Sequence, residues 1–304
     1  MGILEAILLG IIQGIAEFLP ISSSGHLAIF QKLFGMNEVG ISFDVFLHIG
    51  TLIAVFIVFW KDILRLFVDG VGIVADSCVN VYRFFRSKNK KEPVEYIRVI
   101  RTAYRKFALL VIVSTIPTGI IGYLGKELVS NASETLIIPG ICLLVTAVLL
   151  FISDQMPDGQ KTPKNTSYFN AVFMGICQGI ATLPGLSRSG TTIVAGLLCG
   201  LRRDFVVKYS FIMSIPAILG AAVLEIPDMG KDMATTGVAS YVVGMIVAAV
   251  VGYICIKTML VVVRNKKFKY FSYYCAVVGL VAIIASFVIK YLDLNYNRIT
   301  IRRE

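Results

Sequence analysis

Charged side chains are scarce in this sequence: Asp, Glu, Lys and Arg make up 16% of its 304 residues, whereas hydrophobic residues make up 57%. Soluble globular domains typically have about 25% charged residues. The composition therefore excludes an ordinary soluble domain. It indicates a polytopic membrane protein, in which apolar stretches of roughly 20 residues cross the bilayer.

Several chemical signatures are also missing. The six cysteines form no CxxC pair and mostly lie in apolar segments, which argues against a disulfide framework or a thiolate metal cage. There is no GxxxxGK[ST] phosphate loop. The first residues lack a basic stretch and carry Glu5, so we expect them to belong to the mature fold rather than to a signal peptide.

One stretch of the chain occurs twice. Residues 10–26, GIIQGIAEFLPISSSGH, return at 175–191 as GICQGIATLPGLSRSGT, with nine of seventeen positions identical and no gap. Pro20 and the pair Pro184-Gly185 cannot continue a helix. Serines, which are N-cap residues, follow each break. Each copy is thus predicted to be two half-helices, the second of which points its N-terminus into the fold.

The predicted fold class is an all-α polytopic membrane protein with an inverted-topology repeat. Re-entrant helix hairpins are expected at 1–35 and 168–201, each followed by three spans. Because three is an odd number, the second hairpin enters from the opposite face. The first repeat is residues 1–153 and the second is 154–304. The six predicted transmembrane helices are 43–60, 106–124, 135–153, 205–226, 236–263 and 271–290.

Basic residues gather on one predicted side of the membrane. The loops on that side hold twenty Lys and Arg residues, against seven on the other side, and this bias indicates a cytoplasmic location. The loops are 61–106, 154–168, 201–208 and 264–269, and the polar piece 87–95 is expected to be a linker. The net charge of +10 is largely explained in this way. We therefore expect the lipid bilayer as a partner and no nucleic acid.

Polar residues with a chemical role are expected around the first break. Glu17 is a carboxylate in an apolar half-helix, where burial in lipid costs about 2.5–3.5 kcal/mol, so a function is expected for it. Gln13, one turn earlier, is either a partner of Glu17 or a structural amide. Ser22, Ser23 and Ser24, followed by His26, place hydroxyls and an imidazole at a helix N-terminus, which suits an anion. Helix capping alone would need only one of the serines.

The second break carries an arginine. Arg188 stands where Ser23 stands in the first copy, between Ser187 and Ser189. Its planar guanidinium suits phosphate, and a structural ion pair with Glu17 is the alternative. Asp44 and His48, one turn apart at the start of the next span, either line the entrance or serve for capping and packing. They are therefore left out of the predicted catalytic set.

Two motifs resemble those of a known family. QGIAEFLPISSSGH resembles an (E/Q)xxxE element followed by SSxGH, and PGLSRSGTT resembles PGxSRSxxT. Both are signatures of the bacterial undecaprenyl-pyrophosphate phosphatase family, also called the bacitracin-resistance family. The resemblance extends to FDVFLHIG and covers essentially the whole chain. It implies hydrolysis of undecaprenyl pyrophosphate to undecaprenyl phosphate and inorganic phosphate, which recycles the lipid carrier for peptidoglycan synthesis and confers bacitracin resistance.

The resemblance also implies a set of site residues. The implied catalytic residues are Glu17, Ser23, His26 and Arg188, and the implied phosphate-binding residues are Ser22, Ser24, Ser187, Ser189 and Thr192. Glu17 and Gln13 would hold a divalent cation, Mg or Ca, although Gln13 replaces the Glu of some members and removes one charge.

Two routes fit these residues: Ser23 attacks with His26 as base, or water attacks while Ser23 donates a hydrogen bond. The implied location is the bacterial plasma membrane, with the site opening to the outer face, and a homodimer is left open.

The competing prediction is a membrane transporter or flippase for a lipid phosphate, because inverted repeats with broken helices are typical of secondary carriers. A purely structural membrane protein would leave the buried Glu17 and Arg188 unexplained. Phosphate release by the purified protein separates the enzyme from the transporter.

Overall fold

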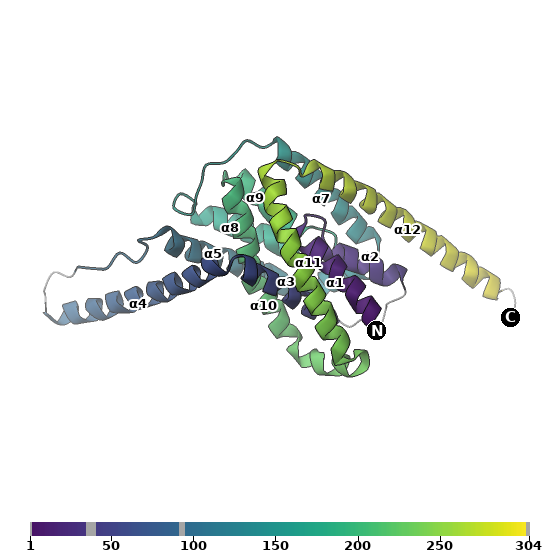
Figure 1. The fold of residues 1–304 in the computed structure, drawn as a ribbon, viewed down its shortest axis with the longest axis horizontal. Coiled ribbons are helices and arrows are strands. Elements are labelled where there is room, and N and C mark those ends of the chain that lie inside the picture. Colours follow the sequence, from purple (N-terminus) through teal and green to yellow (C-terminus); the bar gives the residue numbers. More distant parts are fainter. Residues whose placement is uncertain (1, 35–40, 91–94, 302–304) are drawn as a thin grey trace.

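A computed structural model describes residues 2–34, 41–90 and 95–301, with the side chains of 2–32, 34, 42–87, 95–224 and 237–291. These residues form helices and connections without a named strand (Figure 1). The first half of the chain contains α1 (Ile3–Phe18), α2 (Ser23–Leu33), α3 (Ile41–Val58), α4 (Trp60–Lys90), α5 (Ala103–Leu124), α6 (Lys126–Ser133) and α7 (Ile137–Gln155). The second half contains α8 (Tyr168–Ile180), α9 (Arg188–Leu198), α10 (Arg203–Thr236), α11 (Val238–Arg264) and α12 (Lys269–Ile301).

Five stretches of helix are long and apolar enough to cross a bilayer. They agree with five of the six predicted spans to within three residues at each end. These stretches are Ala103–Leu124, Ile137–Gln155, Arg203–Leu224, Val238–Arg264 and Lys269–Tyr291.

The remaining predicted span, 43–60, corresponds to α3 (Ile41–Val58) within two residues at each end, and it is wrong only in continuing past the bend that follows Val58. The chain bends by 85° between α3 and α4, and only the two helices together pass as a sixth span. Lys61, Asp62 and Arg65 follow the bend, and their burial in hydrocarbon would be costly. The predicted loop 61–106 is also wrong over 61–90, which form α4, because its charges follow one face of a helix. Of the predicted linker 87–95, residues 91–94 lie outside the described residues.

Both predicted helix breaks are confirmed. α1 ends at Phe18 and α2 begins after Ser22, whose hydroxyl oxygen accepts a hydrogen bond from the Gly25 N–H (3.3 Å). α9 begins after Ser187, which accepts in the same way from the Gly190 N–H (3.1 Å). Proline stops the first half-helix and a serine cap starts the second, so the local sequence explains each break.

Small residues bring the half-helices close to their neighbours. α1 packs along α11, and α8 packs along α5. A Cβ added at Gly10 would lie 2.7 Å from the Gly244 carbonyl oxygen, and one added at Gly179 would lie 2.7 Å from Ile121 Cβ. Glycine therefore permits these contacts, as expected for tightly packed membrane helices.

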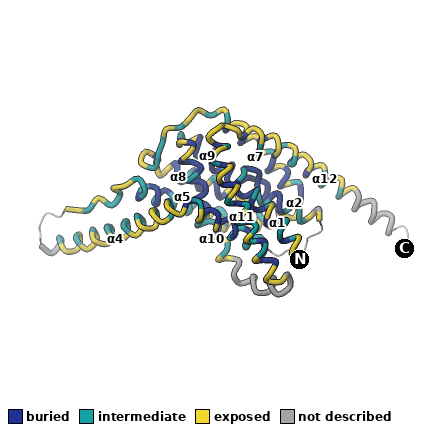
Figure 2. Tube along the Cα trace, in the orientation of Figure 1, coloured by how far each residue is buried: buried dark blue, intermediate teal, exposed yellow. Residues whose placement is uncertain are grey.

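The buried residues concentrate where the half-helices meet the longer helices (Figure 2). α4 extends away from this bundle beside residues 95–102, and one side of it is exposed (Figures 1 and 2). Over residues 269–291 of α12, many apolar side chains are also exposed, with Val277, Ile284 and Phe287 all more than half accessible. Such a surface fits contact with lipid.

Candidate active site

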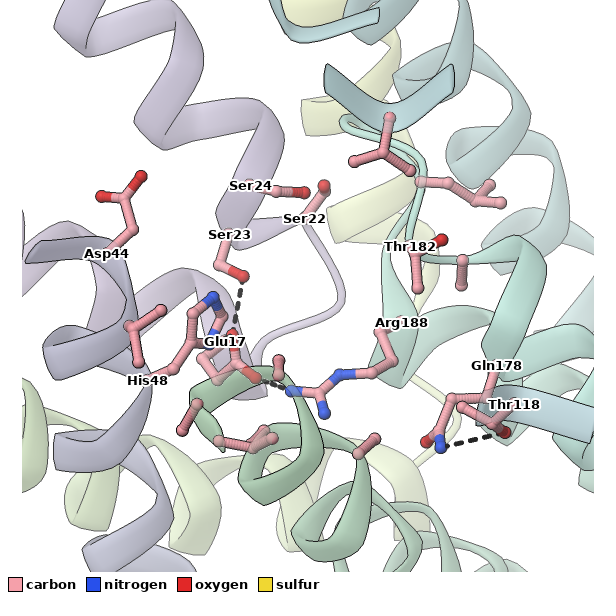
Figure 3. Close-up of a pocket in the computed structure, with 18 residues that line it drawn as sticks. Glu17, Ser22, Ser23, Ser24, Asp44, His48, Thr118, Gln178, Thr182 and Arg188 are labelled. Carbon is pink, nitrogen blue, oxygen red and sulfur yellow. Dashed lines mark hydrogen bonds and ion pairs between the residues drawn. The ribbon is translucent and has the colours of Figure 1, made fainter. Parts of the chain in front are cut away.

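A cavity of about 370 Å³ lies where the two helix breaks meet. Ser22, Ser23 and Ser24 line it from the first break, and Arg188 lines it from the second (Figure 3). Residues of α3, α5 and α10 complete the wall. Because α2 begins at Ser23 and α9 begins at Arg188, the positive ends of two helices lie at one cavity.

Glu17 is the centre of the polar cluster. Its side chain is only 3% exposed and forms an ion pair through Oε1 with the Arg188 guanidinium. The Ser23 hydroxyl donates a hydrogen bond to Glu17 Oε2 at 2.7 Å (Figure 3). An opposite charge and a donated hydrogen bond both favour the ionised carboxylate. The structure thus brings together three of the four predicted catalytic residues.

Gln13 and His48 complete the surroundings of the carboxylate. Gln13 Nε2 donates to Glu17 Oε2 (3.1 Å) and lies 2.9 Å from His48 Nδ1. His48 Nδ1 is itself 3.4 Å from Glu17 Oε2, and His48 lines the cavity. His48 is left out of the predicted catalytic set because a packing role fits the sequence equally well. The available signal was a second histidine inside an otherwise apolar span.

Asp44 belongs to the same wall. It lies one turn before His48 on α3, lines the cavity, and accepts a hydrogen bond from Gln31 Nε2 (3.0 Å). Of the two roles left open for Asp44 and His48, the structure favours lining the cavity. Asp44 therefore adds a second carboxyl group to the site.

His26 lies apart from the Ser23 hydroxyl. It is buried, and its Nδ1 is 2.8 Å from the Ser22 carbonyl oxygen while its Nε2 is 2.8 Å from the Tyr274 hydroxyl. Both ring nitrogens thus have other partners, and His26 does not line the cavity. The route in which His26 is the base for Ser23 stays a prediction, since His26 Nε2 here contacts Tyr274 of α12, a partner that the sequence could not reveal.

The predicted phosphate-binding residues fall into two groups. Ser22 and Ser24 line the cavity. Ser187 instead caps α9, and its own backbone N–H donates a hydrogen bond to the Thr146 hydroxyl oxygen at 3.0 Å. The Thr192 hydroxyl lies 2.5 Å from the Ser210 hydroxyl. Ser187, Ser189 and Thr192 are therefore buried supports of the second turn rather than cavity-lining groups.

The described side chains around Glu17 supply oxygen donors for a divalent cation but no complete ligand set. The described residues contain no group of three His, Cys, Asp or Glu side chains that could hold a metal ion. Oxygen donors are nevertheless close together, and Gln13 Oε1 is buried without a hydrogen-bond partner among the described residues. Magnesium keeps several waters and is commonly bound by one or two carboxylates plus substrate phosphates. The Glu17 and Gln13 oxygens fit such a partial set.

Comparisons with known proteins show which family this chain is similar to. The sequence model of the family described as bacitracin resistance protein BacA matches residues 6–281. The chain is 42% identical to an undecaprenyl-diphosphatase of Methanosphaera stadtmanae over 95% of this chain and 100% of that relative. It is also 42% identical to an undecaprenyl-diphosphatase of Halothermothrix orenii over 93% of this chain and 98% of that relative.

Proposed function

The chain belongs to the bacitracin resistance protein BacA family, and from this premise we propose that it hydrolyses undecaprenyl diphosphate to undecaprenyl phosphate and inorganic phosphate. The relatives are named for this activity, and this chain matches nearly their whole length. The observation that carries the proposal is the contact of Ser23 and Arg188 with the buried carboxylate of Glu17 between two helix N-termini. The product lipid returns to cell-wall synthesis, and this recycling underlies bacitracin resistance.

Binding of the diphosphate uses positive groups that are already in place. Arg188 reaches into the cavity and can form two parallel hydrogen bonds to a phosphate. The free N–H groups at the starts of α2 and α9 add to the attraction, and Ser24 offers a hydroxyl. Because the cavity is surrounded by apolar spans, these charges act with little screening by water.

The reaction follows from the pair of Ser23 and Glu17. Ser23 Oγ attacks the terminal phosphorus, and its proton passes to Glu17 Oε2, which already accepts the hydrogen bond at 2.7 Å. The bond between that phosphorus and the bridging oxygen breaks, and undecaprenyl phosphate leaves. Water then attacks the phosphorus bound to Ser23, the bond from phosphorus to Ser23 Oγ breaks, Glu17 returns the proton to that oxygen, and phosphate leaves with the atoms of the water. Arg188 stabilises charge on the transferred group.

His26 takes a positioning role in this scheme. Its Nδ1 contact with the Ser22 carbonyl and its Nε2 contact with Tyr274 hold the first turn of α2 against α12. Ser22 itself has a positive φ of 71°, a conformation that side chains rarely adopt. His26 thereby keeps the adjoining Ser23 at Glu17.

A divalent cation, Mg or Ca, fits the oxygens of Glu17 and Gln13. When bound, it supplies positive charge that neutralises the diphosphate oxygens. Arg188 already occupies Glu17 Oε1, so this carboxylate has one oxygen left for Ser23, Gln13 and the cation. Dependence of turnover on added Mg or Ca after treatment with a chelator tests this part.

The arrangement of helices supports an inverted repeat of 1–153 and 154–304, with the cavity open to the outer face of the plasma membrane. α1 packs along α11 while its counterpart α8 packs along α5, so each half-helix contacts the same kind of neighbour. Thr118 of α5 and Ile218 of α10 line the cavity fifteen residues after these helices begin, at Ala103 and Arg203. Those starts adjoin the basic connections, and this supports a cavity nearer to the other side.

Rapid acid quench tests the activity and the route together. Purified protein is mixed with undecaprenyl diphosphate labelled in its terminal phosphate, and both released phosphate and labelled protein are followed. We expect phosphate release, with acid-stable label on Ser23 before turnover is complete and none on a Ser23→Ala variant. Product without labelled protein would favour attack by water. An absence of phosphate release, with transfer of lipid between leaflets, would favour the flippase instead.

A further inference from the structure

A second cavity, of about 790 Å³, lies at the far ends of α5 and α8 from the active site. It is formed by residues 98–102, the first turn of α5 and the start of α8. Four basic side chains line it, and we name it the basic pocket: Arg98, Arg101, Lys106 and Lys164. None of these residues belongs to the catalytic cluster.

The positive charge of the basic pocket is only partly compensated. Arg101 forms an ion pair with Asp76 (3.2 Å), a carboxylate that also binds Arg105. Lys106 Nζ lies 3.3 Å from the centre of the Tyr168 ring. Among the described residues, no carboxylate is paired with Arg98, Lys106 or Lys164. Three cations therefore converge without an anionic partner.

The backbone adds to this field. α5 begins at Ala103 after its cap Thr102, and α8 begins at Tyr168 after its cap Ser167. Residues from both first turns line the basic pocket, so the positive ends of two helices meet there. Basic side chains combined with helix N-termini favour a phosphate group.

The surroundings indicate that this phosphate belongs to a lipid. Tyr168 lies beside Phe169, which is 78% exposed, and Tyr96 is 55% exposed. Exposed aromatic side chains of this kind are typical of the membrane–water interface. The pocket also lies on the side with most of the Lys and Arg residues, where anionic lipids favour basic segments.

α4 supports the same assignment. Its polar side is occupied, because Asp62 accepts from Tyr104, and Asn80 exchanges hydrogen bonds with Ile97. Its other side is apolar and exposed, and includes Leu64, Phe67, Val71, Val74 and Val81. The helix bends by 85° away from α3 (Figure 1). A helix with this division can lie in the membrane surface and hold the basic pocket at headgroup depth.

We propose that the basic pocket binds the headgroup phosphate of an anionic phospholipid on the side of the membrane opposite to the active site. The three uncompensated cations and the two helix N-termini bind the phosphate, while acyl chains follow the apolar side chains beside the pocket. A zwitterionic headgroup, whose own cation meets Arg98 and Lys164, binds more weakly.

Native mass spectrometry of the full chain in detergent tests this site. Dioleoyl-phosphatidylglycerol, dioleoyl-phosphatidylcholine and inorganic phosphate are titrated separately, and the affinity of the first bound molecule is measured. A basic residue near an anionic surface contributes about a fivefold change in affinity. Arg98→Gln with Lys164→Gln should therefore weaken phosphatidylglycerol about 25-fold. The control is Lys267→Gln with Lys269→Gln, which removes the same charge from the exposed junction between α11 and α12 on that side.

The expected result is preferential binding of phosphatidylglycerol that the pocket variant loses and the control keeps. Equal weakening in both variants would overturn the proposal by showing a general charge effect. Equal binding of phosphatidylcholine would also overturn it. Inorganic phosphate that binds as tightly as the lipid would assign the pocket to a free anion instead. A melting curve of each variant shows that the fold is retained.

Discussion

The two helix breaks share a scaffold and differ in chemistry. Ser22 and Ser187 both cap the following half-helix through the N–H of a glycine three residues on. At the differing positions, however, Glu17 corresponds to Thr182 and Ser23 corresponds to Arg188. The scaffold therefore supplies two helix N-termini, whereas the carboxylate and nucleophile come from one break and the guanidinium from the other.

The paired glutamines show how the surroundings determine a role. Gln13 contacts Glu17 and His48. Gln178 donates to the Thr118 hydroxyl (Figure 3) and to the Met213 carbonyl oxygen. Gln178 thus joins α8 to its neighbours, as a structural amide does. A duplicated residue keeps its position, but its function depends on whether a charged partner lies within reach.

Substitution at the acidic position should give the largest difference between the breaks. Glu17→Gln should lower turnover by about 1,000-fold, because the amide cannot accept the Ser23 proton or balance Arg188. Thr182→Ala should change turnover less than about threefold, since the Thr182 hydroxyl donates only to the Gly179 carbonyl within its own half-helix. Released phosphate from purified variants measures both. Similar losses at 17 and 182 would contradict the asymmetry.

The guanidinium of the second break should tolerate a substitute poorly. Arg188→Lys should lower turnover by about 100-fold, because an ammonium cannot form two parallel hydrogen bonds to a phosphate oxygen pair. Steady-state kinetics should place most of the loss in kcat. Near-normal turnover of Arg188→Lys would show that charge alone is needed there. Arg202→Lys, at an exposed arginine outside the cavity, is the matched control.

The shared packing of the half-helices should appear as an equal loss of stability. Gly10→Ala and Gly175→Ala should each destabilise the protein by about 1–3 kcal/mol, because the added methyl group meets backbone of α11 or of α5. Gly119→Ala is the control, since a Cβ there meets nothing within 4 Å. Melting temperatures in detergent compare the three. A loss at only one of the two positions would show that the halves pack differently.

The smallest effect should distinguish the two caps. Ser22 has a φ of 71° and Ser187 has a φ of −66°. Glycine relieves the backbone strain only at position 22. Replacing a serine cap by glycine lowers stability by only about a few tenths of a kcal/mol. Ser22→Gly should therefore be more stable than Ser187→Gly by about 0.5–1 kcal/mol in the same melting experiment. The opposite order would show that the Ser22 side chain contributes more than its strain costs.

Local features of the sequence were sufficient for much of the fold. Pro20 and Pro184 end helices because they lack an N–H, and Ser22 and Ser187 start them because their hydroxyl oxygens accept from free N–H groups. The long apolar runs gave five spans close to their observed limits. These effects act within a few residues, so a single sequence contains them.

The site was predicted only in part for the same reason. The motifs identified Glu17, Ser23 and Arg188, but the contact of Glu17 with His48 depends on how α1 lies against α3. The contact of His26 with Tyr274 spans 248 positions of the chain. No pattern in the sequence near these residues predicts either contact.

The sequence by itself determined that this protein is a membrane enzyme of the BacA family with two broken helices, because composition, proline breaks and contiguous motifs act locally. Only the tertiary structure decided which histidine approaches the carboxylate, how the chain bends between α3 and α4, and which basic residues gather into a pocket. Those outcomes depend on the packing of helices far apart in the chain, where the close approach of backbones selects one set of neighbours from many.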